Sequence, residues 1–199
     1  MGDEKKRQGS VQRTTRETDI NLKLVIDGSG QTEIKSGVPF LDHMLTLFGV
    51  HGFYDLSLKA TGDTEVDDHH TVEDIGICLG QVFSEALGDK SGIARYGLCY
   101  LPMDETLVRV VVDISNRPFL HYDVQVSDQK LGTFDTALAQ EFMRAFAQHA
   151  GVTLHVDLIH GSNSHHIIEA VFKGLARAMN QATVKIDGLT GTLSSKGLL

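Results

Sequence analysis

Two short stretches of the chain carry adjacent histidines followed at a fixed distance by a glutamate, His69–Glu73 (HHTVE) and His165–Glu169 (HHIIE). On a helix, residues four apart lie on one face, whereas neighbouring residues point about 100° apart. The first histidine of each stretch can therefore share a ligand with its glutamate, while the second points elsewhere. Imidazole and carboxylate together predict divalent-metal binding, with the adjacent histidines serving two different ions.

Ligands of this kind suit Mn²⁺, Fe²⁺, Co²⁺ or Zn²⁺, and the order of affinities alone does not choose among them. The alternative is that each pair is a solvated helix start whose acids complement the helix dipole. Two clusters in register argue against that alternative. Asp67 and Asp68 are candidate caps of the first helix, and Asp74, four residues after His70, is a candidate for orienting that imidazole.

The composition of the 199-residue chain limits the other functions open to it. Acids outnumber bases by 26 to 18 and the bases form no stripe, so a nucleic-acid partner is not expected. No apolar run approaches the roughly 20 residues of a membrane span, so no membrane partner is expected either.

The cysteines Cys78 and Cys99 lack CxxC spacing and are expected to be reduced and buried in a cytoplasmic protein. Residues 1–10 are charged and aperiodic, which predicts a disordered tail.

The elements that must hold these residues follow from hydrophobic periodicity. Alternation over Ile20–Ile26, turn residues at Asp27–Gly30 and a continuation through Ile34 predict a β-hairpin. A helix is expected from Pro39 to about Val50, then a strand over residues 54–60 and a helix that Gly88 ends.

The second half of the chain repeats this order. Strands are expected at 107–114, 119–126 and 152–158, and helices at 136–150 and after Asn163. An offset of 96 maps the first histidine cluster onto the second, and an offset of 98 maps His43 onto Glu141. The chain is therefore predicted to be an internal duplication within one globular domain, with halves at 11–92 and 93–187 followed by a terminal segment, 188–199.

Five motifs, in this order, resemble the imidazoleglycerol-phosphate dehydratase family over about residues 13 to 197: Phe40–Met44, Asp68–Asp74, Ser115–Pro118, Asn163–Ala170 and Ser194–Gly197. The resemblance implies an α/β (α+β) fold, each half of the type β-β-β-α-β-α with a small mixed sheet backed by two helices. It also implies a 24-subunit homo-oligomer with two Mn²⁺ per active site at subunit interfaces. The implied reaction is a lyase step of histidine biosynthesis, in which imidazole glycerol phosphate loses water to become imidazole acetol phosphate.

The resemblance also implies roles for individual residues. Glu17, His70 and His166 are the catalytic candidates, and Glu17 is expected to transfer the proton. Expected metal ligands are His43, His69, His70, Glu73, His165, His166 and Glu169. Expected contacts to the phosphorylated substrate are Glu17, His43, Arg95, Arg117, Lys173, Ser195 and Lys196, and the terminal segment is expected to complete the phosphate site. Asp104 and Glu105 are further candidates for the active site, without an assigned role.

Glu141 departs from the resemblance, because some members of the family have a histidine at this position. Its correspondence to His43 in the duplication predicts that it is the eighth metal ligand, since a carboxylate can replace imidazole as a hard ligand for Mn²⁺. The alternative is that Glu141 is a solvated helix residue.

The expected chemistry explains why such ligands are needed. The proton to be lost is on an unactivated carbon, so an electron sink is required. A metal-stabilised imidazolate can expel the hydroxyl and form a diazafulvene whose neighbouring C–H is acidic.

Two other classes of protein use similar ligands. A dimetal hydrolase more often has HxH or HExxH spacing and does not need the distant phosphate-binding bases. A ferritin-like metal-storage protein needs four long helices, and the alternating strand patterns argue against it.

Overall fold

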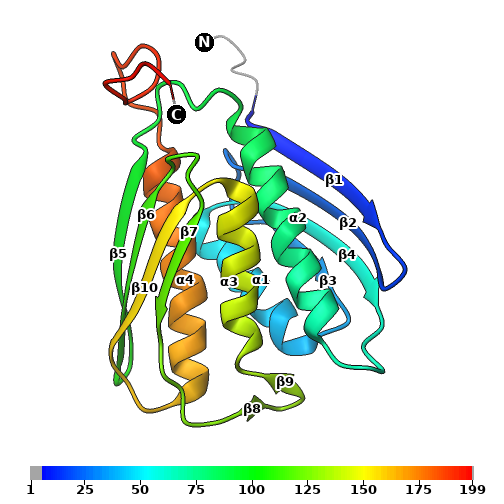
Figure 1. The fold of residues 1–199 in the computed structure, drawn as a ribbon. Coiled ribbons are helices and arrows are strands. Elements are labelled where there is room, and N and C mark those ends of the chain that lie inside the picture. The colour runs from blue at the N-terminus through cyan, green and yellow to red at the C-terminus, as the bar shows by residue number, and fades with distance from the viewer. Residues whose placement is uncertain (1–5, 199) are drawn as a thin grey trace.

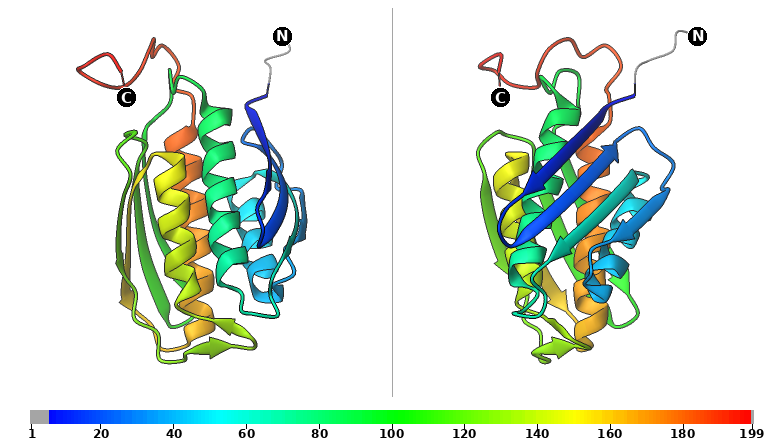
Figure 2. Two further views of the ribbon diagram at one scale, coloured as in Figure 1. Left: turned by 45° about the vertical axis from the view of Figure 1, so that its right-hand side comes forward. Right: turned by 90° about the vertical axis from the view of Figure 1, so that its right-hand side faces the viewer.

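The computed structural model describes residues 6–198 and places four helices between two four-stranded sheets (Figures 1 and 2). Of the predicted N-terminal tail, residues 1–5 lie outside the described residues. Gln8 to Ser10 belong to the first strand, so the prediction of a disordered tail is wrong for them. The backbone of these residues pairs with the next strand instead.

The first sheet has the order β1-β2-β4-β3, with strands β1 (Gln8–Thr14), β2 (Thr18–Val25), β4 (Asp55–Gly62) and β3 (Thr32–Lys35). Alternate residues of β2 are buried, as its pattern predicted. The predicted hairpin between β2 and β3 is wrong, because β4 lies between them. Strand β3 pairs in parallel with β4, so the chain must cross over through helix α1 (Pro39–Gly52).

The second sheet has the equivalent order β5-β6-β10-β7, with strands β5 (Tyr96–Met103), β6 (Thr106–Asp113), β10 (Thr153–His160) and β7 (Phe119–Asp123). As in the first half, the last strand of this order pairs in parallel with its neighbour. The duplication, the mixed sheets and the β-β-β-α-β-α order are therefore confirmed. The second half adds a ribbon of β8 (Lys130–Leu131) and β9 (Phe134–Asp135).

The remaining helices are α2 (His69–Leu87), α3 (Leu138–Ala150) and α4 (Ser164–Thr183). Helix α1 packs on α4, and α2 packs on α3, so each helix pair combines the two halves. Glycines allow α2 and α3 to approach closely, because a Cβ on Gly80 would lie 2.8 Å from the Ala150 nitrogen and from the Phe146 oxygen. The first turns of α2, α3 and α4 all lie at the same end of the molecule (Figure 1).

The C-terminal segment lies at the opposite end, beyond the last turn of α4 (Figures 1 and 2). Among the described residues, no helix is both long and apolar enough to cross a membrane. Both cysteines are free; Cys78 is buried as expected, whereas Cys99 is only half-buried.

Candidate metal centre and phosphate pocket

The cluster of the second half forms where α4 begins. The side chain of Asn163 accepts hydrogen bonds from the backbone nitrogens of His165 and His166, at 2.9 and 3.3 Å, and so starts the helix as predicted. One turn later, Oε2 of Glu169 lies 3.1 Å from Nε2 of His165. Nε2 of His43, from α1, lies 3.1 Å from the same oxygen. The three ligand atoms lie within 4.8 Å of one another, so this donor set fits a divalent ion.

Glu169 is the buried centre of this group. Burial acts to raise its pKa, but the ammonium of Lys173 and the hydrogen bonds from both imidazoles outweigh burial and lower the pKa. Lys173 forms an ion pair with the second oxygen of Glu169. The structure therefore places Lys173 beside the candidate metal ligands and not with the other predicted phosphate contacts.

The cluster of the first half is more open. Nε2 of His69 lies 3.8 Å from Oε2 of Glu73, and both side chains are about half exposed. Asp68 occupies the N-cap position but makes no side-chain capping bond, whereas the carboxylate of Asp67 accepts a hydrogen bond from the backbone nitrogen of His69 at 2.8 Å. His69 and Glu141 line one hollow of about 410 Å³, in which the carboxylate of Glu141 pairs with Arg144.

His70 is held by a residue that the sequence did not suggest. Its Nδ1 lies 2.9 Å from Oδ2 of Asp63, in the loop before α2, and this hydrogen bond raises the pKa of His70. Asp74 instead accepts hydrogen bonds from Arg13 and Thr18, so its predicted contact with His70 is wrong. Oε2 of Glu17 lies 3.9 Å from Nδ1 of His70.

His166, in the second half, also has a carboxylate partner, but from a different part of the fold. Its Nδ1 lies 2.8 Å from Oε2 of Glu105, in the turn between β5 and β6. This hydrogen bond raises the pKa of His166. Together with the bonds from the backbone nitrogens of Asn163 and Ser162, it holds the pKa of Glu105 far below its usual range.

Most of the predicted phosphate contacts gather at the other end of the molecule. A hollow of about 520 Å³ is lined by Arg95, Ser115, Asn116, Arg117, Ser194, Ser195, Lys196 and Leu198. Nε and Nη2 of Arg95 donate to the Asp113 carboxylate at 2.7 and 3.1 Å, and Nη1 donates to the Leu193 carbonyl at 2.7 Å. These bonds fix the guanidinium and attach the C-terminal segment to the second sheet.

This candidate phosphate pocket and the candidate metal cluster are far apart. The backbone nitrogen of Arg95 donates to the carbonyl of Ala182, near the end of α4, whereas His165 stands at its start. At 1.5 Å per residue, the helix between residues 165 and 182 separates the two sites by about 26 Å.

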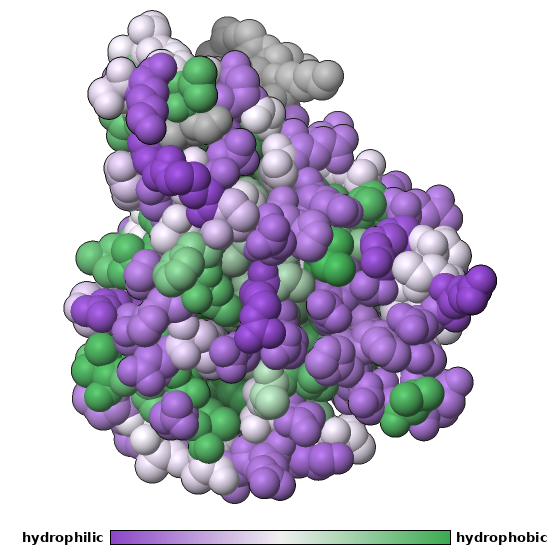
Figure 3. Space-filling model, in the orientation of Figure 1, coloured by the Kyte–Doolittle hydropathy of each residue, from purple (hydrophilic) through white to green (hydrophobic). Residues whose placement is uncertain are grey.

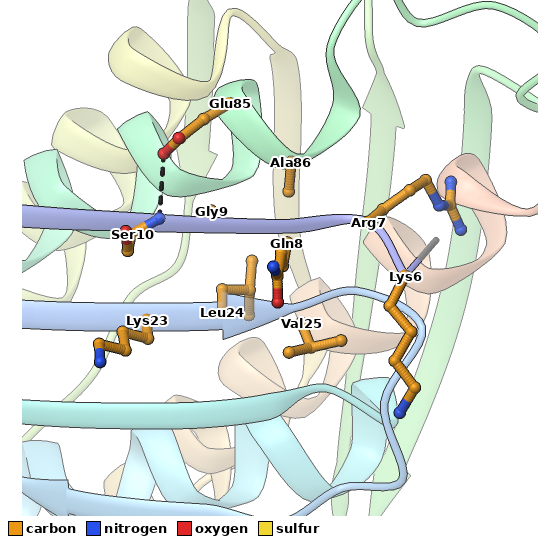
Figure 4. A pocket seen from close by; sticks show the side chains of 10 residues that line it. All are labelled: Lys6, Arg7, Gln8, Gly9, Ser10, Lys23, Leu24, Val25, Glu85 and Ala86. Atoms are coloured by element: carbon orange, nitrogen blue, oxygen red, sulfur yellow. Dashed lines mark hydrogen bonds between the residues drawn. The ribbon is translucent and has the colours of Figure 1, made fainter. Parts of the chain in front are cut away.

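Another hollow, of about 640 Å³, lies between β1, β2 and the end of α2 (Figure 4). Glu85 there accepts a hydrogen bond from the backbone of Ser10 at 3.0 Å. Arg7 is engaged by Asp27 and by the carbonyl of Thr183. No histidine lines this hollow, so it lacks the chemistry of the clusters described above.

Comparisons with known proteins identify the family. Residues 36–179 match the sequence profile of the family described as imidazoleglycerol-phosphate dehydratase. A relative from Desulfotalea psychrophila with that name is 61% identical over 196 residues, covering 98% of each chain. One from Pelobacter propionicus is 58% identical over 193 residues, covering 97% of this chain and 99% of the relative.

Solved structures show the same fold. The imidazoleglycerol-phosphate dehydratase of Staphylococcus aureus superposes with a TM-score of 0.82 at 47% identity, over 90% of this chain and 99% of that one. The Pyrococcus furiosus enzyme, solved in complex with (S)-C348, gives a TM-score of 0.83 at 40% identity, over 95% and 100% of the two chains. The chain described here therefore belongs to the imidazoleglycerol-phosphate dehydratase family.

Proposed function

We propose that this chain converts imidazole glycerol phosphate to imidazole acetol phosphate and water with two Mn²⁺ ions per active site, which neighbouring chains hold together. The dehydratase activity, a step of histidine biosynthesis, follows from membership of the family. The convergence of His43, His165 and Glu169 is the observation that supports a metal-dependent route. Two imidazoles and a carboxylate, without thiolate, are a donor set that suits Mn²⁺.

The two halves supply two ligand groups that we propose to be equivalent. His43, His165 and Glu169 form one, and His69, Glu73 and Glu141 form the other. In each group, one helix of the other half contributes a ligand, because α1 packs on α4 and α3 packs on α2. The rings of His70 and His166 lie 6.2 and 6.3 Å from those of His69 and His165. We propose that they complete the ions on neighbouring chains, which gives eight ligands for two ions.

The bound ions and the surrounding residues would have separate roles in the reaction. Bound metal would stabilise negative charge on the substrate's imidazole ring and so assist departure of the hydroxyl on the adjoining carbon. Glu17 would accept the proton, because its carboxylate lies beside His70 and makes no close side-chain hydrogen bond among the described residues. Arg95, Arg117, Ser195 and Lys196 would bind the phosphate at the far end of the substrate.

The dimensions of the chain support assembly. Imidazole glycerol phosphate spans roughly 10 Å when extended, on ordinary bond lengths. The substrate is therefore too short to bridge the metal cluster and the phosphate pocket of one chain, which lie about 26 Å apart. Lys173, beside the metal cluster, would therefore reach the phosphate of a substrate held in a neighbouring chain's pocket.

The molecular surface is compatible with such assembly. Apolar side chains are exposed over the second sheet, including Leu98, Phe119 and Ile159 (Figure 3). We propose a 24-subunit homo-oligomer in which contacts between chains complete the site. Two free cysteines and a small phosphorylated substrate fit the cytoplasm.

Activity and its metal dependence are tested together. The chain is freed of metal, reloaded with Mn²⁺ and incubated with imidazole glycerol phosphate, and formation of the ketone is followed by absorbance. We expect ketone only after reloading. Release of inorganic phosphate without ketone would instead identify a dimetal hydrolase.

A further inference from the structure

We propose that Glu105 is a positioning residue, which fixes the ring of His166 so that Nε2 is the nitrogen presented to metal. The proposal rests on the ligand role of His166 given above. Oε2 of Glu105 lies 2.8 Å from Nδ1 of His166. Nothing in the sequence suggested this contact, because the two residues are 61 positions apart.

The carboxylate of Glu105 is itself held firmly. Its Oε1 accepts from the backbone nitrogens of Ser162 and Asn163, at 3.1 and 2.8 Å, and from the hydroxyl of Thr106 at 3.0 Å. These donors come from the loop before α4 and from the start of β6. Three donors on one oxygen leave the other oxygen directed at His166.

An ionised carboxylate only accepts hydrogen bonds, so the ring nitrogen that faces it must hold the hydrogen. When neutral, as a metal ligand must be, His166 therefore has its hydrogen on Nδ1 and its lone pair on Nε2. Partners of this kind orient metal-binding imidazoles, and removing them typically lowers metal affinity about 10- to 100-fold.

The first half provides an independent parallel. His70 also directs Nδ1 to a carboxylate, at 2.9 Å, but the carboxylate is that of Asp63. Glu17, in the turn between β1 and β2 that corresponds to the turn of Glu105, lies 3.9 Å from the same nitrogen. The corresponding turns thus carry carboxylates with different tasks: Glu105 is fixed as a support, and Glu17 is left available to react.

Glu105→Gln tests the proposal with little change of shape. Three donors still require an oxygen at the Oε1 position, so the new amide nitrogen must face His166. It would donate to Nδ1 and move the ring hydrogen to Nε2, which blocks metal binding there. We expect Mn²⁺ affinity of one site to fall about 10- to 100-fold, measured by titration of the full chain with electron paramagnetic resonance. The melting temperature of the metal-free chain should stay close to its original value.

Three further variants make the result decisive. His166→Ala should show the same loss of affinity, and Glu105→Gln combined with His166→Ala should show no additional loss. Asp128→Asn is the matched control, because Asp128 accepts from Ser164 at the same end of α4 and is not hydrogen-bonded to an imidazole. It should bind Mn²⁺ like the unaltered chain.

Each contrary result has one meaning. Normal Mn²⁺ affinity in Glu105→Gln, together with weak binding in His166→Ala, would overturn the positioning role and leave the proposed function intact. Additive losses in the double variant would also overturn it, because Glu105 would then act through another group. Normal affinity in His166→Ala would remove the ligand role of His166 and the inference with it.

Discussion

The two halves of the molecule share one motif but surround it differently. In the second half, Glu169 is 8% exposed at its side chain and contacts two imidazoles and an ammonium. In the first half, Glu73 is 47% exposed and approaches only one histidine, at 3.8 Å. The packing partner explains this difference, since α1 brings His43 against α4 whereas Glu141 of α3 is turned to Arg144. A repeated motif therefore gives one cluster whose side chains are already in contact and one that is open.

The strand ends show a second contrast between the halves. Arg7 precedes β1 and binds Asp27 with two nitrogens, as Arg95 precedes β5 and binds Asp113. Only the second half adds Arg117 and the C-terminal segment beside this pair. The arginine–aspartate pair is thus present twice, but the candidate phosphate contacts are gathered beside only one of the two pairs.

The largest expected effect concerns Glu17, the turn carboxylate of the first half, which corresponds to Glu105 of the second. Glu17→Gln keeps the shape of the side chain but removes its basicity, so turnover should fall at least ~10²-fold with metal content unchanged. Turnover is measured from ketone formation, and metal content by mass spectrometry. Turnover close to that of the unaltered chain would show that Glu17 does not transfer the proton.

The next prediction tests the open cluster. Glu141→Ala should lower bound metal from two ions per chain towards one, because the exposed first-half group would lose one of its ligands. Glu141→His should restore occupancy and much of the activity. Full occupancy in the alanine variant would mean that the symmetry with His43 does not extend to metal binding.

A third prediction tests the contrast between the strand ends. Arg95→Ala and Arg117→Ala should each weaken substrate binding by roughly 1.5 to 3 kcal/mol, the scale of a charged hydrogen bond. Arg7→Ala, the first-half counterpart, should leave substrate affinity unchanged. Binding is measured with and without the phosphate group on the ligand. If the Arg95 and Arg117 variants lose as much affinity for the dephosphorylated ligand, these arginines do not contact phosphate.

The smallest expected effect compares the two cluster glutamates in metal-free protein. Glu169→Gln should destabilise the chain by about 1 to 3 kcal/mol, because the charged partner of Lys173 is lost from a nearly buried site. Glu73→Gln should change stability by no more than about 0.5 kcal/mol, because its environment is solvated. Thermal unfolding in the presence of chelator measures both. Equal shifts would contradict the difference in preorganisation.

The sequence predicted what depends on local spacing. The helical placement of both histidine clusters, the cap at Asn163 and the duplicated order of elements all follow from contacts within a few residues. Strand β5 was not anticipated, because its apolar side chains, such as Tyr96 and Leu98, point outward. It packs its backbone on α4 through Gly97, where a Cβ would overlap the backbone oxygen of Ala178.

The hydrogen bonds and ion pairs that orient the side chains of the site were harder to predict. The hydrogen bond from His166 to Glu105 joins distant parts of the chain, and no local pattern marks it. The ion pair between Lys173 and Glu169 could have been predicted from the sequence, because the two residues are four apart on one helix. Periodicity fixes which face a side chain occupies, whereas its partner depends on how the two halves pack.

The most direct test of the account is complementation between two impaired variants, assayed at a substrate concentration too low to saturate the Arg95→Ala variant. His165→Ala removes a proposed metal ligand, and Arg95→Ala removes a proposed phosphate contact at the other end of the chain. If each active site combines the metal cluster of one chain with the phosphate pocket of another, co-expression should restore activity in roughly a quarter of the sites, since each of two positions is filled correctly half the time. A co-assembled mixture no more active than the two separate variants would contradict the proposal that neighbouring chains share the site.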